Sequence, residues 1–141
     1  MRLHVIFRQL GRIYLFNAIF LFIAAIISIV HQETSILPLL YSTIISVLFG
    51  VFPLIFVPNI ENLKASEGVF VVVFGWVTTC LIGTLPYVLW GGEFNLINAW
   101  FESVSGFTTT GSTILTNVEV LPMGLLFWRS ATHWSCGART A

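Results

Sequence analysis

The sequence predicts an all-α integral membrane protein, with two leading transmembrane helices followed by a helix–loop–helix unit that is cut off in its last helix. Two observations support this fold class. Apolar residues make up 57% of the chain and charged residues only 9%, with a mean hydropathy of +0.94, whereas a soluble domain carries about 25% charged residues. In addition, a polar segment rich in threonine and glycine, residues 101–113, lies between strongly apolar runs.

The first three elements are uncharged apolar runs of membrane length. They are Ile13–Val30 with 18 residues, Ile36–Val57 with 22 residues and Val69–Trp90 with 22 residues. A spanning helix needs about 20 apolar residues to cross a hydrocarbon core of about 30 Å, with roughly 17 as the lower limit. All three runs therefore qualify as transmembrane helices, the first narrowly.

The first run has two interpretations, a membrane anchor or a cleaved signal peptide. It follows three arginines, Arg2, Arg8 and Arg12. Its 18 residues exceed the usual signal-peptide core of about 7–15, and no small-x-small cleavage site follows Val30. As an anchor, the run places the N-terminus in the cytoplasm, because basic residues favour that side. His31–Ser35 then lies outside and Asn59–Gly68 returns to the cytoplasm.

The fourth element is a short helix over Glu93–Ser105, which follows a break at Gly91-Gly92. At about 1.5 Å per residue its 13 residues reach only ~20 Å, so it does not span the membrane. Glu93 and Asn95 suit a helix N-terminus. One apolar face is expected from residues at helical spacing, namely Phe94, Ile97, Trp100, Phe101 and Val104. We expect a re-entrant helix that ends at Gly106 and directs its negative C-terminal end into the membrane, where cations gather.

The residues after this helix have the chemistry of an ion filter. Backbone carbonyls replace the water shell of a potassium ion without adding a full negative charge. Gly111 is the candidate hinge, because glycine readily adopts the backbone conformations that turn successive carbonyls toward one axis. Thr109 and Thr110 are expected to supply the carbonyls before the hinge, and Ser112 to continue the wall. Threonine hydroxyls can hold such a loop in shape.

The last elements are an external loop over Thr116–Pro122 and a fourth apolar run over Met123–Trp134. This run stops after about 12 residues, which is too short to span the membrane. Small polar residues follow it to the end of the sequence at Ala141.

Composition also excludes several classes of function. Six basic and six acidic residues cancel, so nucleic-acid binding has no electrostatic support. The sequence has no aspartate, which removes most options for paired-carboxylate catalysis or a calcium-type cage. Cys80 and Cys136 are far apart and Cys80 lies within an apolar run, so neither a disulfide framework nor a zinc site is indicated. We expect no enzymatic activity, no cofactor and no nucleic-acid partner.

The pore-loop segment resembles that of the Trk/Ktr/HKT family of potassium transporters, and most closely that of the bacterial TrkH/TrkG membrane subunits. The family pattern reads Phe-Glu-Ser-x-Ser-Gly-x-Thr-Thr-Thr-Gly, and the matching positions are Phe101, Glu102, Ser103, Ser105, Gly106, Thr108, Thr109, Thr110 and Gly111. The likeness extends to Glu67-Gly68, Leu121-Pro122, Phe127–Ser130 and His133-Trp134.

The resemblance implies potassium uptake across the cell inner (cytoplasmic) membrane, with potassium held at Thr109 and Thr110. It implies residues 1–68 as a two-helix region and residues 69–141 as the first helix–pore loop–helix repeat, incomplete in its last helix. Each such repeat supplies one of four pore loops of a four-fold filter. It also implies membrane lipid contacts, a homodimer and a peripheral cytoplasmic nucleotide-binding regulatory subunit, with the transported potassium as the sole bound ion.

The sequence departs from the family after Trp134. Where the family has Gly-Gly-Met-Gly, this chain has Ser135–Ala141, as expected of a truncated or frame-shifted reading frame. We therefore expect no transport by the chain alone. The alternative is a multipass accessory or structural membrane protein without transport activity.

Two charged residues near the filter have open roles. Glu102 is either a functional carboxylate near the ion path or a brace that supports the pore loop from behind. Arg129 is either a gate or one half of a structural ion pair. Ser105 and Gly106 are expected to support the pore helix.

Overall fold

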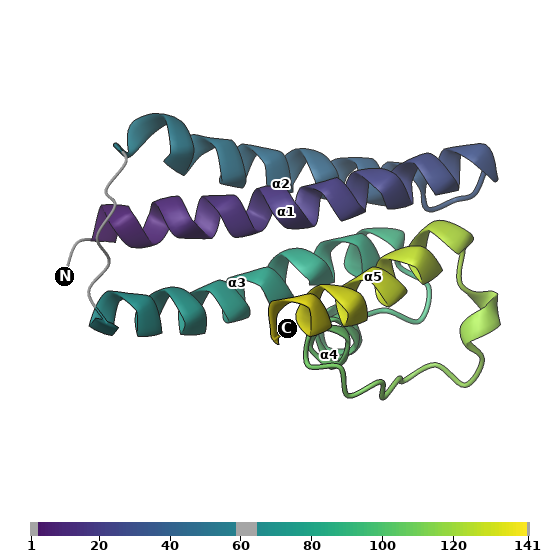
Figure 1. Cartoon of the computed structure of the whole chain (residues 1–141). Helices are drawn as coiled ribbons and strands as arrows, with labels where there is room; N and C mark the ends of the chain where they lie inside the picture. Colours follow the sequence, from purple (N-terminus) through teal and green to yellow (C-terminus); the bar gives the residue numbers. More distant parts are fainter. Residues whose placement is uncertain (1–2, 59–64, 141) are drawn as a thin grey trace.

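The computed structural model describes residues 3–58 and 65–140, with side chains as far as residue 135. All regular elements in this part of the chain are helical (Figure 1). In order they are α1 (Leu3–Val30), α2 (Ile36–Phe56), α3 (Ala65–Trp90), α4 (Leu96–Phe107), the short 3-10 helix η1 (Val118–Val120) and α5 (Met123–Thr140). The predicted all-helical fold class is confirmed. Arg2 and most of the expected cytoplasmic segment Asn59–Gly68, as far as Lys64, lie outside the described residues.

Three of these helices, α1, α2 and α3, are long and apolar enough to cross a membrane. The chain is therefore a multi-pass membrane protein. α1 begins at Leu3 and α3 at Ala65, ahead of the apolar runs that start at Ile13 and Val69. Both helices are longer than predicted because helix formation does not require an apolar sequence. In α1 the added N-terminal residues Val5, Ile6 and Leu10 are buried against neighbouring helices.

The helices α1 and α2 form an antiparallel hairpin (Figure 1). Small residues allow their backbones to approach closely, since a Cβ atom added at Gly11 would lie 2.7 Å from the Gly50 carbonyl oxygen. Two buried hydroxyls on α2 are satisfied within the helix: Ser42 donates to the Pro38 carbonyl and Thr43 to the Leu39 carbonyl, each at 2.7 Å. These two hydroxyls are thus accommodated inside the hairpin.

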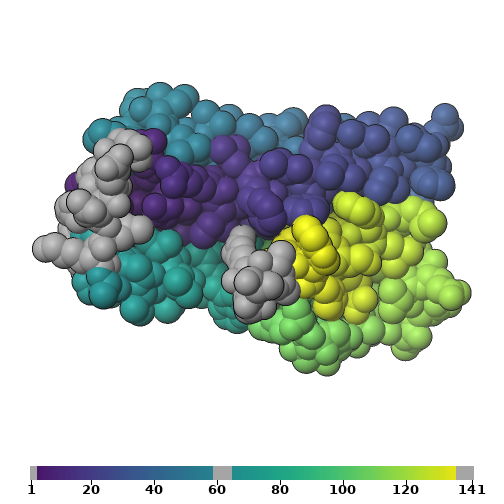
Figure 2. Space-filling view, in the orientation of Figure 1, coloured from purple at the N-terminus to yellow at the C-terminus, as the bar shows by residue number. Residues whose placement is uncertain are grey.

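The helices α3, α4 and α5 form a second unit beside the hairpin. In Figure 1 α4 is seen nearly end-on, below α5. The chain leaves α3 through Gly91 and Gly92, which have φ values of +78° and +63° and therefore adopt a conformation that glycine tolerates best. Figure 2 shows α5, in yellow, against α1, with the green residues before it at the edge of the same face.

The predicted bounds of the short helix were wrong by two or three residues at each end. The helix begins at Leu96 rather than Glu93, because the Asn95 side chain accepts a hydrogen bond from the Asn98 amide at 2.9 Å and caps the helix there. It ends at Phe107, beyond Gly106. Gly106 is helical, and its lack of a side chain permits close packing against α5.

Contacts near the turn between α1 and α2 connect the two units. The Glu33 carboxylate, in the turn between α1 and α2, accepts hydrogen bonds from the Met123 and Gly124 amides at 2.7 and 3.2 Å. A carboxylate is favourable at a helix N-terminus, so this residue caps α5 from a site 90 positions away in sequence. Trp90 at the end of α3 also donates to the Thr34 hydroxyl at 3.1 Å.

α5 continues as a helix to Thr140, although the apolar run stops at Trp134. Small polar residues do not end a helix by themselves, because their side chains can bond to the helix backbone. The Ser135 hydroxyl, for example, donates to the Ala131 carbonyl at 2.8 Å. The expected external loop Thr116–Pro122 contains the helix η1.

Candidate functional site

The candidate filter segment begins where α4 ends. The Thr109 amide donates to the Gly106 carbonyl and the Thr110 amide to the Ser105 carbonyl, each at 3.1 Å. These hydrogen bonds fold the chain back over the last turn of α4. Gly111 has a φ of +75°, which fits the hinge expected from the sequence.

Thr109 also has a positive φ, of +57°. This conformation is rare for a residue branched at Cβ and persists only where surrounding contacts determine it. This conformation could not be predicted from the sequence, because threonine does not favour it. Strained residues of this kind gather at functional sites.

The four predicted filter carbonyls differ in their surroundings. Within the described part of the chain, the carbonyl oxygens of Thr109 and Thr110 accept no hydrogen bond, and both residues are exposed. The Ser112 carbonyl accepts a hydrogen bond from the Ser105 hydroxyl at 2.5 Å. The Gly111 carbonyl accepts a weak one from Arg129 Nη2 at 3.5 Å, a separation longer than that of an ordinary N–H···O hydrogen bond. Side chains of α4 and α5 therefore hold the carbonyls of Ser112 and Gly111, while the carbonyls of Thr109 and Thr110 remain available to a ligand.

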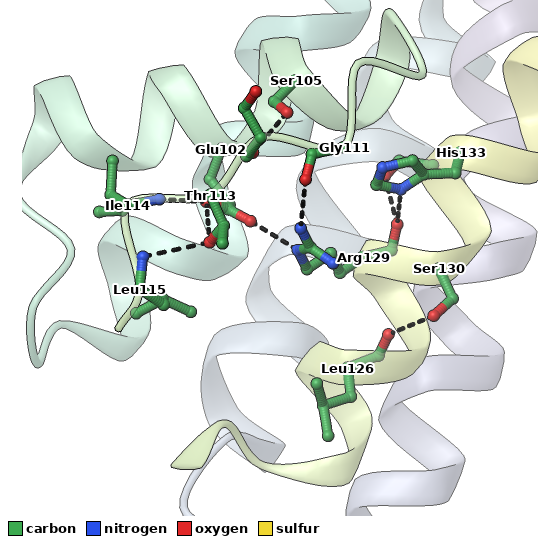
Figure 3. A network of polar contacts seen from close by, with 12 residues as sticks. Glu102, Ser105, Gly111, Thr113, Ile114, Leu115, Leu126, Arg129, Ser130 and His133 are labelled. Atoms are coloured by element: carbon green, nitrogen blue, oxygen red, sulfur yellow. Dashed lines mark hydrogen bonds and ion pairs between the residues drawn. The ribbon is translucent and has the colours of Figure 1, made fainter. Parts of the chain in front are cut away.

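Glu102 on α4 is the centre of a polar network behind the segment (Figure 3). Its side chain is 1% exposed. Oε2 accepts hydrogen bonds from the Thr113 hydroxyl at 2.9 Å and the Ile114 amide at 3.4 Å. Oε1 accepts one from Arg129 Nε at 2.6 Å. Both carboxylate oxygens are thus paired, as a buried charge requires.

The expected support residues Ser105 and Gly106 both lie on the buried side of α4. Ser105 holds the Ser112 carbonyl, as described above. A Cβ atom added at Gly106 would lie only 2.3 Å from the Thr132 hydroxyl oxygen on α5. The glycine therefore permits the close approach of α4 and α5. Sequence reasoning singled out neither Thr113 nor Thr132, because their contacts join residues from different elements.

The apolar face expected on the short helix packs against the rest of the chain only in part. Ile97 is 77% exposed and Phe101 45% exposed, whereas Phe94 is buried and Trp100 and Val104 pack against the core. Helical spacing carried no information about which part of the helix surface packs inward. Glu102 and Ser103 are also buried, because this side of α4 holds the filter segment.

Comparison with known proteins identifies the family. The family model described as TrkH, cation transport protein, matches residues 42–141. The chain belongs to this family. It is a family of transporters and not of enzymes, in agreement with both the resemblance and the absence of catalytic motifs in the sequence.

Individual relatives agree with this assignment. An uncharacterized cation transporter of Methanocaldococcus jannaschii is 35% identical over 128 residues, which are 91% of this chain and 27% of that protein. The Trk system potassium uptake protein TrkI of Halomonas elongata is 36% identical over 133 residues, 94% of this chain and 27% of TrkI. The crystal structure of the potassium transporter TrkH from Vibrio parahaemolyticus superposes with a TM-score of 0.89 at 24% identity, covering 97% of this chain and 30% of that one. The chain thus has the TrkH fold and spans less than a third of the length of these proteins.

Proposed function

We propose that this TrkH-family chain takes part in potassium uptake by supplying one pore loop of a carbonyl-lined filter. The main supporting observation is the segment after α4, in which Gly111 turns the chain and the Thr109 and Thr110 carbonyls accept no hydrogen bond from the residues that the structure describes. Trk relatives named as potassium uptake proteins support potassium as the ion.

In the proposed mechanism, the Thr109 and Thr110 carbonyls replace part of the hydration shell of the ion. The C-terminal end of α4 adds its negative potential. Gly111 provides the turn, and Ser112 continues the wall with its carbonyl fixed by Ser105. Each interaction is with a dipole and not with a full charge, so the ion can enter and leave.

Glu102, Ser105 and Gly106 support the pore helix and loop in this mechanism. The contacts of Glu102 with Thr113 and Ile114 favour the bracing role over direct contact with the ion. The ion pair with Glu102 favours a structural role for Arg129 over a gate. Both roles follow from the same buried network.

We further propose the larger arrangement that the family resemblance implies. Residues 1–68 form a leading two-helix region and residues 69–141 the first of four pore-loop repeats, so one copy of this chain does not transport potassium alone. The protein lies in the cell inner membrane among lipids, with its N-terminus in the cytoplasm. A homodimer and a nucleotide-binding regulatory subunit at the cytoplasmic face complete the assembly, with no resident cofactor.

A chimaera tests this function. The stretch of Halomonas elongata TrkI that aligns with this chain is replaced by the residues of this chain, and the product is expressed in bacteria that lack potassium uptake systems. We expect the chimaera to restore growth at low potassium and the 141-residue chain alone to restore none. A chimaera that reaches the membrane folded but takes up no potassium would favour the accessory role.

A further inference from the structure

We propose that Arg129 is a positioning residue that fixes the direction of the peptide group between Gly111 and Ser112, so that α5 sets the geometry of the filter segment. This inference rests on the proposed function of that segment, because only there does the direction of a carbonyl affect an ion.

The first support is the geometry of the guanidinium group (Figure 3). Arg129 Nε donates to Glu102 Oε1 at 2.6 Å, while Nη2 donates to the Gly111 carbonyl at 3.5 Å. The guanidinium is planar and its donors have fixed directions. Once Nε is bound to the buried carboxylate, the direction of Nη2 is therefore also fixed. A lysine ammonium lacks this second, rigidly oriented donor.

The second support is the empty space around Gly111. A Cβ atom added at this residue would meet no heavy atom within 4 Å, so packing does not hold the residue in place. Among the described residues, Arg129 supplies the one hydrogen bond to this carbonyl. The next carbonyl, that of Ser112, is held by Ser105. Consecutive carbonyls are thus held by two different helices, α5 and α4.

The third support is the rigidity of the backbone that carries Arg129. Its carbonyl accepts hydrogen bonds from the Thr132 hydroxyl at 2.7 Å and pairs with His133 Nδ1 at 2.8 Å. Thr132 is itself packed tightly against Gly106 of α4. A displacement of α5 at this level would therefore move the guanidinium and, with it, the Gly111 carbonyl.

Nuclear magnetic resonance of the 141-residue chain in lipid nanodiscs tests the proposal. The observables are the carbonyl carbon shift of Gly111 and the amide shifts of Ser112 and Ile114. We expect Arg129→Lys to shift the Gly111 and Ser112 signals and to leave Ile114 in place, because the Ile114 amide is bound to Glu102. The matched control is Ser130→Ala on the same helix, whose hydroxyl donates to the Leu126 carbonyl.

Two results would overturn the proposal. In one, Arg129→Lys moves Gly111 and Ser112 no more than Ser130→Ala does. In the other, Ile114 and the α4 signals move as much as Gly111, which would show a general structural role. If Arg129→Lys does not fold, Arg129→Gln is measured with the same criteria, because it leaves the Glu102 acceptor of the Ile114 amide in place. These signals report geometry without any transport, so failure of the chimaera would remove the proposed function and leave this measurement unaffected.

Discussion

Replacing Glu102 by alanine is expected to cause the largest loss of stability of any single substitution in the site, about 3 kcal/mol or more. The substitution leaves the Arg129 guanidinium without its partner, and it removes the acceptor for the Thr113 hydroxyl and the Ile114 amide. Breaking a buried ion pair by removing one member costs about 3–5 kcal/mol. Because the Arg129 side chain is 18% exposed, we expect the lower end of this range.

The loss is measured as the free energy of unfolding of the chain in detergent micelles, followed by circular dichroism. Glu93→Ala is the matched control, since Glu93 is an exposed carboxylate just before α4. The free energy of unfolding of Glu102→Gln should lie between those of Glu102→Ala and Glu93→Ala, because an amide retains one acceptor oxygen but not the charge. Equal stability of Glu102→Ala and Glu93→Ala would contradict the bracing role of Glu102.

The second large loss of stability is expected from Gly106→Val, because the valine side chain should force α4 and α5 apart. Even the Cβ atom would lie 2.3 Å from the Thr132 hydroxyl oxygen and 3.1 Å from its Cβ. Thr132 is 2% exposed and its hydroxyl is bonded to the Arg129 carbonyl, so it cannot easily move away. Overpacking of this kind costs about 1–3 kcal/mol and occasionally more.

A double-mutant cycle separates this steric effect from a change in helix propensity. Gly106→Ala should destabilise the chain in the unfolding experiment above, and Thr132→Ala should recover part of the loss when the two are combined. The control is Gly68→Ala in α3, where an added Cβ meets no heavy atom within 4 Å. Alanine there should be neutral or stabilising by up to about 1 kcal/mol. Additive effects at Gly106 and Thr132 would rule out the proposed contact.

The sequence predicted the transmembrane helices well because their signal is local. A run such as Ile36–Val57 is apolar enough to cross a membrane whatever it packs against, and α2 occupies nearly the same residues. Helix ends were less predictable, because the start of α4 depends on the Asn95 cap and its end on the hydrogen bonds from the Thr109 and Thr110 amides back to the last turn. Such ends depend on individual hydrogen bonds and not on average composition.

The candidate site could be located from sequence, but not its connections. The Thr-Thr-Thr-Gly pattern after a short helix indicated the segment, and the positive φ of Gly111 fits the expected hinge. Nothing in the sequence paired Glu102 with Arg129, or Glu33 with the start of α5, because these contacts join residues 27 and 90 positions apart. The positive φ of Thr109 could not be predicted either, since its backbone conformation is imposed by the surrounding loop.

The most direct test of the central claim is potassium uptake by the TrkI chimaera carrying Gly111→Ala, compared with Gly91→Ala. The two glycines have φ values of +75° and +78°, and an added Cβ at either meets no heavy atom within 4 Å. Alanine therefore introduces the same backbone strain at both positions, but only Gly111 lies in the proposed filter. We predict that Gly111→Ala abolishes uptake or its preference for potassium over sodium while Gly91→Ala retains both. Equal uptake and equal selectivity in the two variants would contradict the assignment of residues 109–112 as an ion filter.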